Sequence, residues 1–213
     1  MDISMKPTSV SIKDKKSTPY HHGDLRQALI DSAIVILEEE GFKALSLRAV
    51  ARKAGVSQAA PYNHFEDKNE MLAAIAAKGF EEMAAAQQLA LQQSDEGKSK
   101  LIALGKGYVS YGLEHPALLR LMFGPEFAAT GQYPQLSKVS NRGYQQLIDA
   151  VEEHITMEAG DHPPTKVGAA AAWAMVHGLT TLMIEGRIDP DLKEPEKRDA
   201  FIEQVITVLA TGL

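Results

Sequence analysis

The sequence predicts an all-α protein of about nine helices, with a short helix-turn-helix unit at its amino-terminal end and a larger helical unit after it. Apolar residues recur every three or four positions along most of the 213 residues, which is the period of an amphipathic helix. Between turn signals, no segment sustains the period-two alternation that marks a strand. Near residue 67 the composition shifts from short segments with basic faces to long segments rich in alanine. We therefore expect two helical parts and no sheet.

The composition limits the functions open to the chain. With 45% hydrophobic and 23% charged residues, it has enough apolar surface to build a core. It contains no cysteine, which excludes disulfides, thiolate metal sites and cysteine nucleophiles. No apolar run reaches the roughly 18 residues of a membrane span, and no apolar block follows the first lysines as in a secretory signal. We expect a cytoplasmic protein with no membrane partner.

The first expected elements are an arm and one helix. Residues 1–19 are polar and hold a lysine cluster, so we expect a flexible arm there. A helix follows from Asp24 and stops at Gly41, because glycine favours a helix end. Its apolar stripe consists of Leu25, Leu29, Ala33 and Ile36.

Two short helices are expected next. Ser46 can cap the first of them, Gly55 lies in the tight turn that ends it, and Ser57 can cap another helix that runs to about Phe65. Two short helices joined in this way are typical of a helix-turn-helix, whose second helix enters the major groove of DNA. Residues 43–68 carry five basic and two acidic side chains, a local charge of +3 in a chain whose net charge is −6.

The side chains that face outward from this unit are the expected DNA contacts. A glutamine can hold an adenine through two hydrogen bonds, an alanine can touch a thymine methyl group, and an arginine can reach a guanine. The candidates for base contacts are Gln58, Ala59, Tyr62, Asn63 and Arg48, and those for phosphate contacts are Ser46, Ser57, Tyr62, His64 and Lys68. The alternative is a helical hairpin in an ordinary bundle, with Tyr62 and Phe65 as core aromatics. The spacing of the residues alone leaves both open.

Long helices are expected after residue 67. Asp67 and Glu70 form a capping-box pattern that opens a helix over 68–93. Glycine- and proline-containing breakers separate the helices expected after it, at about 98–115, 117–124, 135–158, 165–187 and 195–211.

The stretch from Tyr20 to Leu72 resembles the amino-terminal domain of the TetR family of bacterial transcriptional repressors. The motifs that carry the resemblance are Gly41-Phe42, Ser46-Leu47-Arg48-Ala49-Val50-Ala51, Ala54-Gly55-Val56-Ser57 and Tyr62-Asn63-His64-Phe65 followed by Lys68. By this resemblance, DNA-contacting positions are occupied by Ser46, Arg48, Ser57, Gln58, Ala59, Tyr62, His64 and Lys68. Pro61 departs from the family pattern, in which another apolar residue is more common. The block Tyr20–Leu25, with Trp173 and His177-Gly178, further resembles a subgroup whose regulatory domain carries a Trp-His-Gly signature.

The last two expected helices, 165–187 and 195–211, have wide apolar faces. Small residues in the first of them permit close helix approach. Such faces can form an internal core, or they can pair with a second copy. The resemblance implies the second, a four-helix interface in a homodimer that would suit a palindromic double-stranded DNA operator.

Aromatic and methionine side chains gather in the middle helices and could form an effector pocket. The candidate residues are Tyr108, Tyr111, Met122, Phe123, Phe127, Trp173 and His177. Each could equally be a core residue, and the pocket follows from the resemblance, which implies a small-molecule effector. The segment 124–134 could form a flap over it.

Other chemistry lacks its sequence signals. The seven histidines show no metal-ligand spacing, and no phosphate-binding glycine loop or Gly-x-Ser-x-Gly nucleophile motif occurs. We expect no metal, no cofactor and no enzymatic activity. The resulting hypothesis is a ligand-responsive repressor that binds its operator as a dimer. The alternatives are an all-helical ligand carrier or enzyme with no DNA role, and an activator or nucleoid-associated protein.

Overall fold

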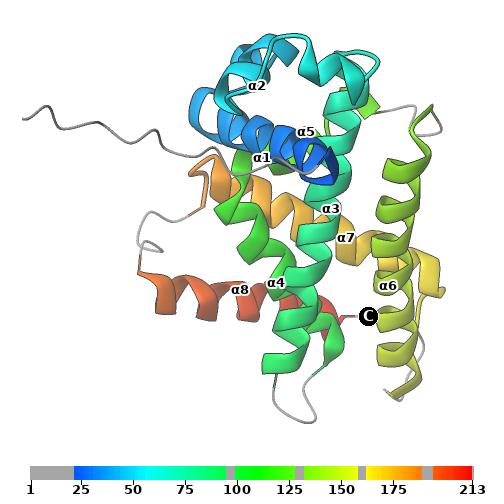
Figure 1. Cartoon of the computed structure of the whole chain (residues 1–213). Coiled ribbons are helices and arrows are strands. Elements are labelled where there is room, and N and C mark those ends of the chain that lie inside the picture. Colours follow the sequence, from blue (N-terminus) through cyan, green and yellow to red (C-terminus); the bar gives the residue numbers. More distant parts are fainter. Residues whose placement is uncertain (1–21, 95–98, 128–131, 158–161, 189–193, 213) are drawn as a thin grey trace, which may run out of the picture.

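The structure is a computed structural model that describes residues 22–94, 99–127, 132–157, 162–188 and 194–212. Within these ranges the chain forms eight α-helices and no strand, which confirms the all-α prediction (Figure 1). The arm expected over residues 1–19 and part of the flap expected over 124–134 lie outside the described residues.

The amino-terminal elements pack at one end of the molecule, at the top of Figure 1. They are α1 (His22–Glu40), α2 (Leu47–Lys53) and the 3-10 helices η1 (Phe42–Ala44) and η2 (Ala60–Asn63). Their shared core consists of buried aliphatic side chains from α1 and α2 together with Phe65. This core holds α2 and η2 in a fixed relation to α1, as a helix-turn-helix requires.

Both ends of α2 are determined by local chemistry. The Ser46 hydroxyl accepts a hydrogen bond from the backbone N–H of Ala49 at 3.2 Å, so Ser46 is the expected cap. At the other end, Gly55 has φ of +70°, a conformation that costs little only for glycine. The N–H groups of Gly55 and Val56 reach back to the carbonyls of Arg52 and Ala51, at 3.2 and 3.0 Å. This Schellman motif makes the tight turn that the sequence predicted.

The third helix is not the α-helix that the sequence predicted over 57–65. It is the four-residue 3-10 helix η2, and its first residues are held by bonds from Ala60 to the Ser57 carbonyl and from Tyr62 to the Ala59 carbonyl. The reason is Pro61, which has no N–H for the Ser57 carbonyl and whose ring clashes with that carbonyl in an α-helix. Ser57 therefore contributes its backbone oxygen, and no side-chain cap is present at η2.

The long helices follow the predicted boundaries within a few residues. They are α3 (Lys68–Gln93), α4 (Lys100–Glu114), α5 (Pro116–Met122), α6 (Pro134–Met157), α7 (Thr165–Ile184) and α8 (Pro195–Ala210), with the 3-10 helix η3 (Pro125–Phe127) after α5. α3 starts beside the helix-turn-helix and runs down the centre of the molecule, and α6 lies along one side (Figure 1).

The predicted cap of α3 is present, with one change. The Asp67 carboxylate accepts from the N–H of Glu70 at 2.8 Å, as expected. Glu70 reaches back past Asp67 and accepts from the N–H of Glu66 at 2.6 Å. The first turn of α3 is thus fastened to Glu66, at the end of the segment 57–66 after α2, which is the expected recognition segment.

α4 is the central helix and packs on α3, α5, α6, α7 and α8. Gly107 lies where it approaches α3 most closely, since a Cβ there would come within 2.7 Å of the Cα of Gln87. The absence of a side chain lets two backbones meet. This close contact holds α3 and α4 against each other, and α3 extends from the helix-turn-helix end into the larger helical part.

α7 is more apolar than the sequence analysis allowed. Its 20 residues have a mean hydropathy of 1.5 in their most apolar window, so by length and composition alone it could cross a membrane. Helices of soluble proteins pass the same test, and this one is interrupted by His177 and Thr180. Only 33% of that window is buried within the chain, and Val167 and Leu182 are exposed. Within the described part of the chain, α7 therefore presents an apolar face that no other element covers.

Candidate nucleic-acid interface and ligand cavity

The segment after α2 turns its polar side chains outward. Pro61 and Phe65 are four residues apart and both buried, so they define the inner side of the segment. The expected contact residues then fall on the outer side. Ser46, Arg48, Ser57, Gln58, Ala59, Tyr62 and Asn63 are exposed, whereas His64 and Lys68 are half-buried.

Tyr62 decides between the two interpretations of this segment. In an ordinary bundle Tyr62 and Phe65 would both be core residues. Phe65 is 1% exposed, but Tyr62 is 55% exposed. This exposure contradicts the hairpin interpretation, in which both aromatics are core residues, and leaves the Tyr62 side chain available for an external contact.

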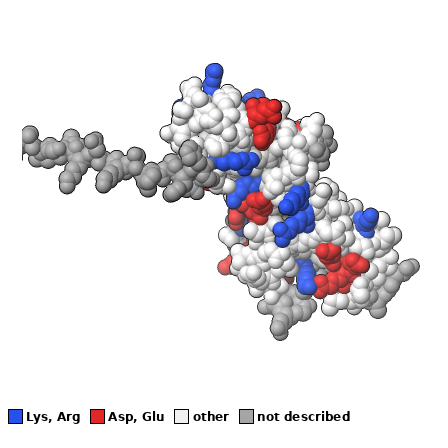
Figure 2. Space-filling view, turned by 45° about the vertical axis from the view of Figure 1, so that its right-hand side comes forward, with Lys and Arg blue, Asp and Glu red and all other residues white. Residues whose placement is uncertain are grey.

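Two lysines near this face already interact with neighbouring side chains. Lys53 forms an ion pair with Glu39 at 2.9 Å, and the Lys68 ammonium lies 4.8 Å from the ring centre of Phe42. Figure 2 shows basic side chains among mostly uncharged surface at this end of the molecule, with acidic groups nearby. The positive charge is modest, so any DNA affinity must depend on fit and on two copies acting together as well as on charge.

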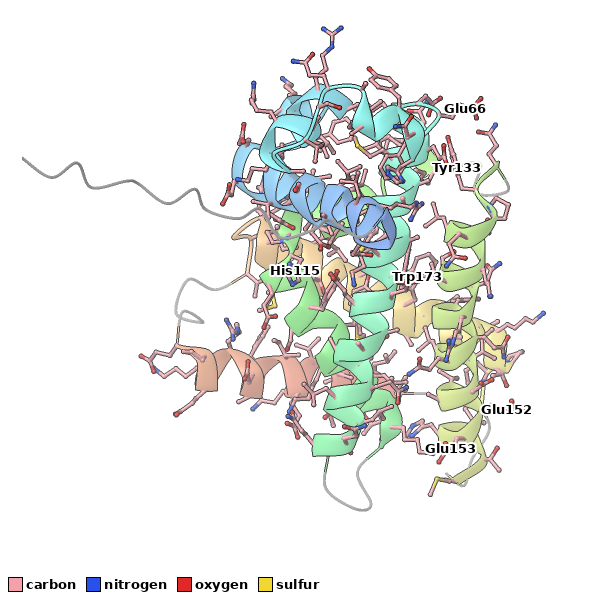
Figure 3. All side chains as sticks on the ribbon, viewed as in Figure 1. Glu66, His115, Tyr133, Glu152, Glu153 and Trp173 are labelled. Carbon is pink, nitrogen blue, oxygen red and sulfur yellow. The ribbon has the colours of Figure 1, made fainter. Side chains whose placement is uncertain are left out.

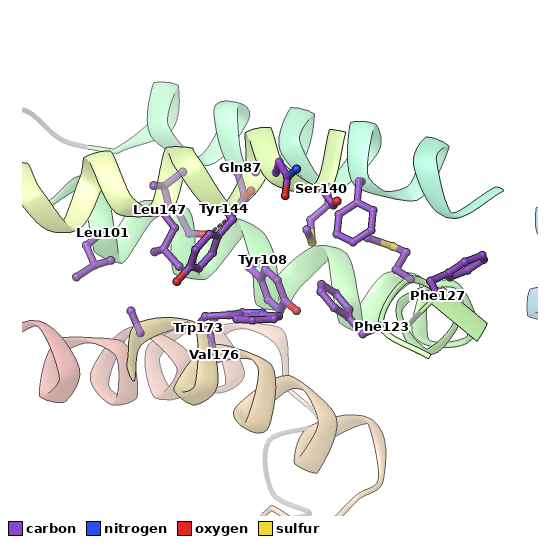
Figure 4. Close-up of a pocket in the computed structure, with 18 of the residues that line it drawn as sticks. Gln87, Leu101, Tyr108, Phe123, Phe127, Ser140, Tyr144, Leu147, Trp173 and Val176 are labelled. Atoms are coloured by element: carbon purple, nitrogen blue, oxygen red, sulfur yellow. Dashed lines mark hydrogen bonds between the residues drawn. The ribbon is translucent and has the colours of Figure 1, made fainter. Parts of the chain in front are cut away.

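A cavity of about 540 Å³ lies in the middle of the larger helical part (Figure 4). Its walls come from α3, α4, α6, α7 and α8 and from the segment 122–127. Trp173 lies in the middle of the molecule, away from Glu66 at the helix-turn-helix end and from Glu152 and Glu153 at the far end of α6 (Figure 3).

Five of the seven residues expected around a pocket line this cavity. They are Tyr108, Met122, Phe123, Phe127 and Trp173. Tyr111 does not line it: its hydroxyl donates to the Glu82 carboxylate at 3.4 Å, and its ring lies 4.8 Å from that of His115. His177 lies behind the wall, with its ring 4.9 Å from that of Phe123.

The sequence analysis missed the contributions of α3 and α6. Gln87 lines the cavity from α3, with Phe80 and Met83. α6 contributes Leu136, Ser140, Asn141, Gly143, Tyr144 and Leu147. Leu136, Ser140, Tyr144 and Leu147 recur at helical spacing, which is the signal that could have identified this wall.

A hydrogen bond joins Tyr108, in the aromatic wall of the cavity, to His177 behind it. The Tyr108 hydroxyl lies 2.8 Å from Nδ1 of His177. Burial raises the pKa of Tyr108 above its usual range, an effect that a hydrogen bond with Trp173 partly offsets. Burial lowers the pKa of His177. Tyr108 therefore stays protonated and donates to a neutral His177, whose own hydrogen we assign to Nε2.

One side-chain contact joins the helix-turn-helix part to α5, the helix that leads to the cavity. The Glu38 carboxylate, near the end of α1, accepts from the N–H groups of Ala117 and Leu118 at 3.1 and 2.9 Å. These two N–H groups are unpaired within the first turn of α5, so Glu38 caps that helix from another part of the fold. α5 ends at Met122, which lines the cavity.

Sequence models of two protein families match the chain. "Bacterial regulatory proteins, tetR family" matches residues 29–75, and "Tetracyclin repressor-like, C-terminal domain" matches residues 101–209, half of the chain. The chain belongs to the TetR family. This TetR-family protein is a DNA-binding transcriptional regulator, and a ligand carrier or enzyme without a DNA role is not favoured.

Individual relatives agree with this assignment of the TetR-family protein. A solved structure of a protein of unknown function from Rhodococcus sp. RHA1 is 33% identical, with a TM-score of 0.75 over 92% of this chain and 96% of that one. The transcriptional activator FasR of Mycolicibacterium smegmatis is 24% identical over 88% of this chain and 82% of its own. FadR of Bacillus subtilis, solved in complex with stearoyl-CoA, is 16% identical with a TM-score of 0.68, over 88% of this chain and 98% of its own, and shows the fold alone.

Proposed function

We propose that this TetR-family regulator is a ligand-responsive repressor that binds a palindromic operator in the cytoplasm as a homodimer. Residues 20–66 form its DNA-binding part, and residues 67–213 its regulatory and dimerising part. The observation that carries the proposal is the outward face of the segment after α2, where Gln58, Ala59 and Tyr62 are exposed while Pro61 and Phe65 anchor the segment below. A short polar surface of this kind fits a major groove about 12 Å wide.

The uncovered faces of α7 and α8 support dimerisation. On α7, Val167, Ala171, Ala174, Gly178 and Leu182 follow one another at helical spacing. Val167 is 56% and Leu182 44% exposed, and Val208 of α8 is 67% exposed. Around Gly178 the described part of the chain leaves open space, so another backbone could approach there. A second copy would cover this apolar surface and place two recognition segments on one face of the DNA.

Two routes connect the cavity to the DNA-binding part. α3 begins at Lys68, beside η2, and passes the cavity at Phe80 and Gln87. α5 leads from the cavity at Met122 to the cap that Glu38 of α1 provides. A ligand that favours a different placement of α5 or α3 would change the spacing of the two recognition segments. Coupling of about 1–3 kcal/mol per binding event is typical of such a link.

The test starts from a random pool of duplex oligonucleotides. Selection on the purified protein should enrich a palindrome whose half-sites lie about one helical turn apart, and binding should weaken steeply as salt rises. In cells, a reporter behind the enriched operator should rise when the gene is deleted. A reporter that falls would make the protein an activator, and no enrichment of any sequence would refute operator binding.

Single substitutions test which residues touch the DNA. Tyr62→Ala and Lys68→Ala should weaken binding across all sequences, whereas Gln58→Ala should change the sequence preference. Gln92→Ala is the matched control for Gln58→Ala, because Gln92 is also an exposed glutamine but lies about 36 Å from Lys68 along α3. If Tyr62→Ala binds as tightly as the unchanged protein, the proposed docking is wrong.

A further inference from the structure

The wall of the cavity carries no charge. Among the described residues that line it there is no aspartate, glutamate, lysine, arginine or histidine. Its polar members are neutral: Gln87, Ser140, Asn141 and the two tyrosines, Tyr108 and Tyr144. Every one of them can donate or accept a hydrogen bond, but none can neutralise an ionised ligand.

The groups nearest the middle of the cavity are held uncharged by the fold. Tyr108 is 5% exposed, and its hydroxyl is engaged by His177 behind the wall. Burial keeps Tyr108 protonated and His177 neutral, because both pKa values move in the direction that disfavours the charged form. An anion bound beside Tyr108 and His177 would meet hydrogen-bonding groups but no opposite charge.

The cavity is long and apolar at both ends. Along α6 its wall runs from Leu136 to Leu147, which lies eleven residues further on, a rise of about 16 Å. Phe127 lies at one end and Leu101 at the other (Figure 4). The hydrogen-bonding groups lie between these ends. A charged head group at either end would lie among apolar side chains, and on the solvent-exposed side, at Asn141 and Tyr144, no lining residue offers it an opposite charge.

Aromatic rings form part of the remaining surface, beside aliphatic and methionine side chains. The rings of Phe80 and Phe123 meet edge to face at 5.3 Å, and Trp173 lies 5.9 Å from both Phe123 and Tyr144. An aromatic ring that packs against another ring is stabilised by more than the burial of its apolar area alone. Figure 4 shows Tyr108, Tyr144 and Trp173 converging on the same space.

We infer that the effector is an uncharged, elongated, largely apolar molecule that carries an aromatic ring and has a hydrogen-bonding group near the middle of the cavity. This inference rests on the proposed ligand-responsive function and specifies the chemistry of the ligand. An ionised carboxylate or phosphate is disfavoured in the cavity, because the described residues that line it carry no opposite charge to compensate for the loss of hydration.

A matched pair of probes tests the charge. Trp173 is the one tryptophan of the chain and lines the cavity, so its fluorescence reports binding. 4-Biphenylmethanol should change this fluorescence and raise the melting temperature, and should bind at least about 30-fold more tightly than 4-biphenylcarboxylate at neutral pH. Decan-1-ol should bind about 2- to 10-fold more weakly than the ring-bearing alcohol. Equal or tighter binding of the carboxylate, tighter binding of decanol, or no response to either alcohol would overturn the inference.

A variant tests the physical reason. Asn141 is an exposed side chain on the cavity wall, and Asn141→Lys adds a cation there. It should increase the affinity for 4-biphenylcarboxylate about 10-fold and change the affinity for 4-biphenylmethanol by less than about 3-fold. Gln145→Lys is the matched control, because Gln145 lies one turn further along α6 and is not part of the wall. Equal effects of the two lysines would overturn the explanation.

The operator complex separates this inference from the proposed function. If 4-biphenylmethanol binds but leaves operator affinity unchanged, the ligand class stands and the proposed response fails. If 4-biphenylcarboxylate alone binds and releases the operator, the response stands and the ligand class is wrong.

Discussion

The Glu38 contact with α5 offers a direct test of how the two parts of the chain communicate. Its carboxylate caps a helix that lies 79 and 80 residues away in sequence, through the N–H groups of Ala117 and Leu118. Glu38→Ala removes both acceptors and leaves these N–H groups to water. Glu38→Gln keeps one neutral acceptor and removes the charge.

The expected size of the effect follows from this geometry. Loss of a helix cap costs about 0.5–2 kcal/mol, and the half-buried position of Glu38 places the cost of Glu38→Ala at about 1–2 kcal/mol. For a chain of this length that corresponds to a melting temperature about 2–8 °C lower at fixed protein concentration. Glu38→Gln should lower the free energy of unfolding by about half as much as Glu38→Ala does.

The informative measurement is the change in operator affinity that an effector causes. If α1 responds to the cavity through α5, Glu38→Ala should bind operator and the uncharged probe nearly as well as the unchanged protein. The probe should then weaken its operator binding at least about 5-fold less than it weakens that of the unchanged protein. Glu40→Ala, an exposed carboxylate on the same helix, should behave as the unchanged protein does.

One result would refute this reasoning. If Glu38→Ala loses stability as expected but the probe still weakens operator binding by the original factor, the contact is structural and the signal travels by another route, such as α3. A stability unchanged by Glu38→Ala would refute the cap itself.

Three further outcomes are expected. Gly55→Ala should destabilise the protein by about 1–2 kcal/mol in urea unfolding, because φ of +70° strains any residue with a Cβ. Burial lowers the pKa of His177, so its contribution to stability is present above about pH 6.5 and is lost as pH falls through its folded pKa; His177→Gln should therefore flatten the fall in unfolding free energy between about pH 7 and 5. Leu182→Asp should give a monomer by light scattering and lose operator binding, whereas Leu89→Asp, also at an exposed leucine, should remain a dimer.

Each of these has a contrary result. Equal stability of Gly55→Ala would show that the turn can relax, and an unchanged pH slope for His177→Gln would assign the acid sensitivity to other groups. A dimeric Leu182→Asp would remove α7 from the proposed interface.

The long helices could be predicted from sequence because their limits depend on neighbouring residues. α3 has the predicted bounds, 68 to 93, since Asp67 caps its start and the chain leaves helical geometry at Ser94. The turn at Gly55 was equally local. The prediction of an α-helix over 57–65 was wrong because Pro61 cannot donate to the Ser57 carbonyl, and the four residues of η2 have 3-10 geometry instead.

The cavity could be predicted only in part. Tyr108, Phe123 and Trp173 were predicted from residue type and do line the cavity. Tyr111 is also a tyrosine of α4, but its hydroxyl faces Glu82 instead. Which side of a helix meets a cavity depends on where the other helices lie, and residue type does not carry that information.

By itself the sequence determined the long helices and the caps at Ser46 and Asp67, because each rests on residues within a few positions of one another. The outward direction of Tyr62 became known only from the tertiary structure. Only the tertiary structure decided that α6 forms one wall of the cavity, that this wall is uncharged and that Glu38 reaches α5. The physical reason is that one apolar stripe serves a core, a cavity or an interface equally well, until the partners that pack against it are in place.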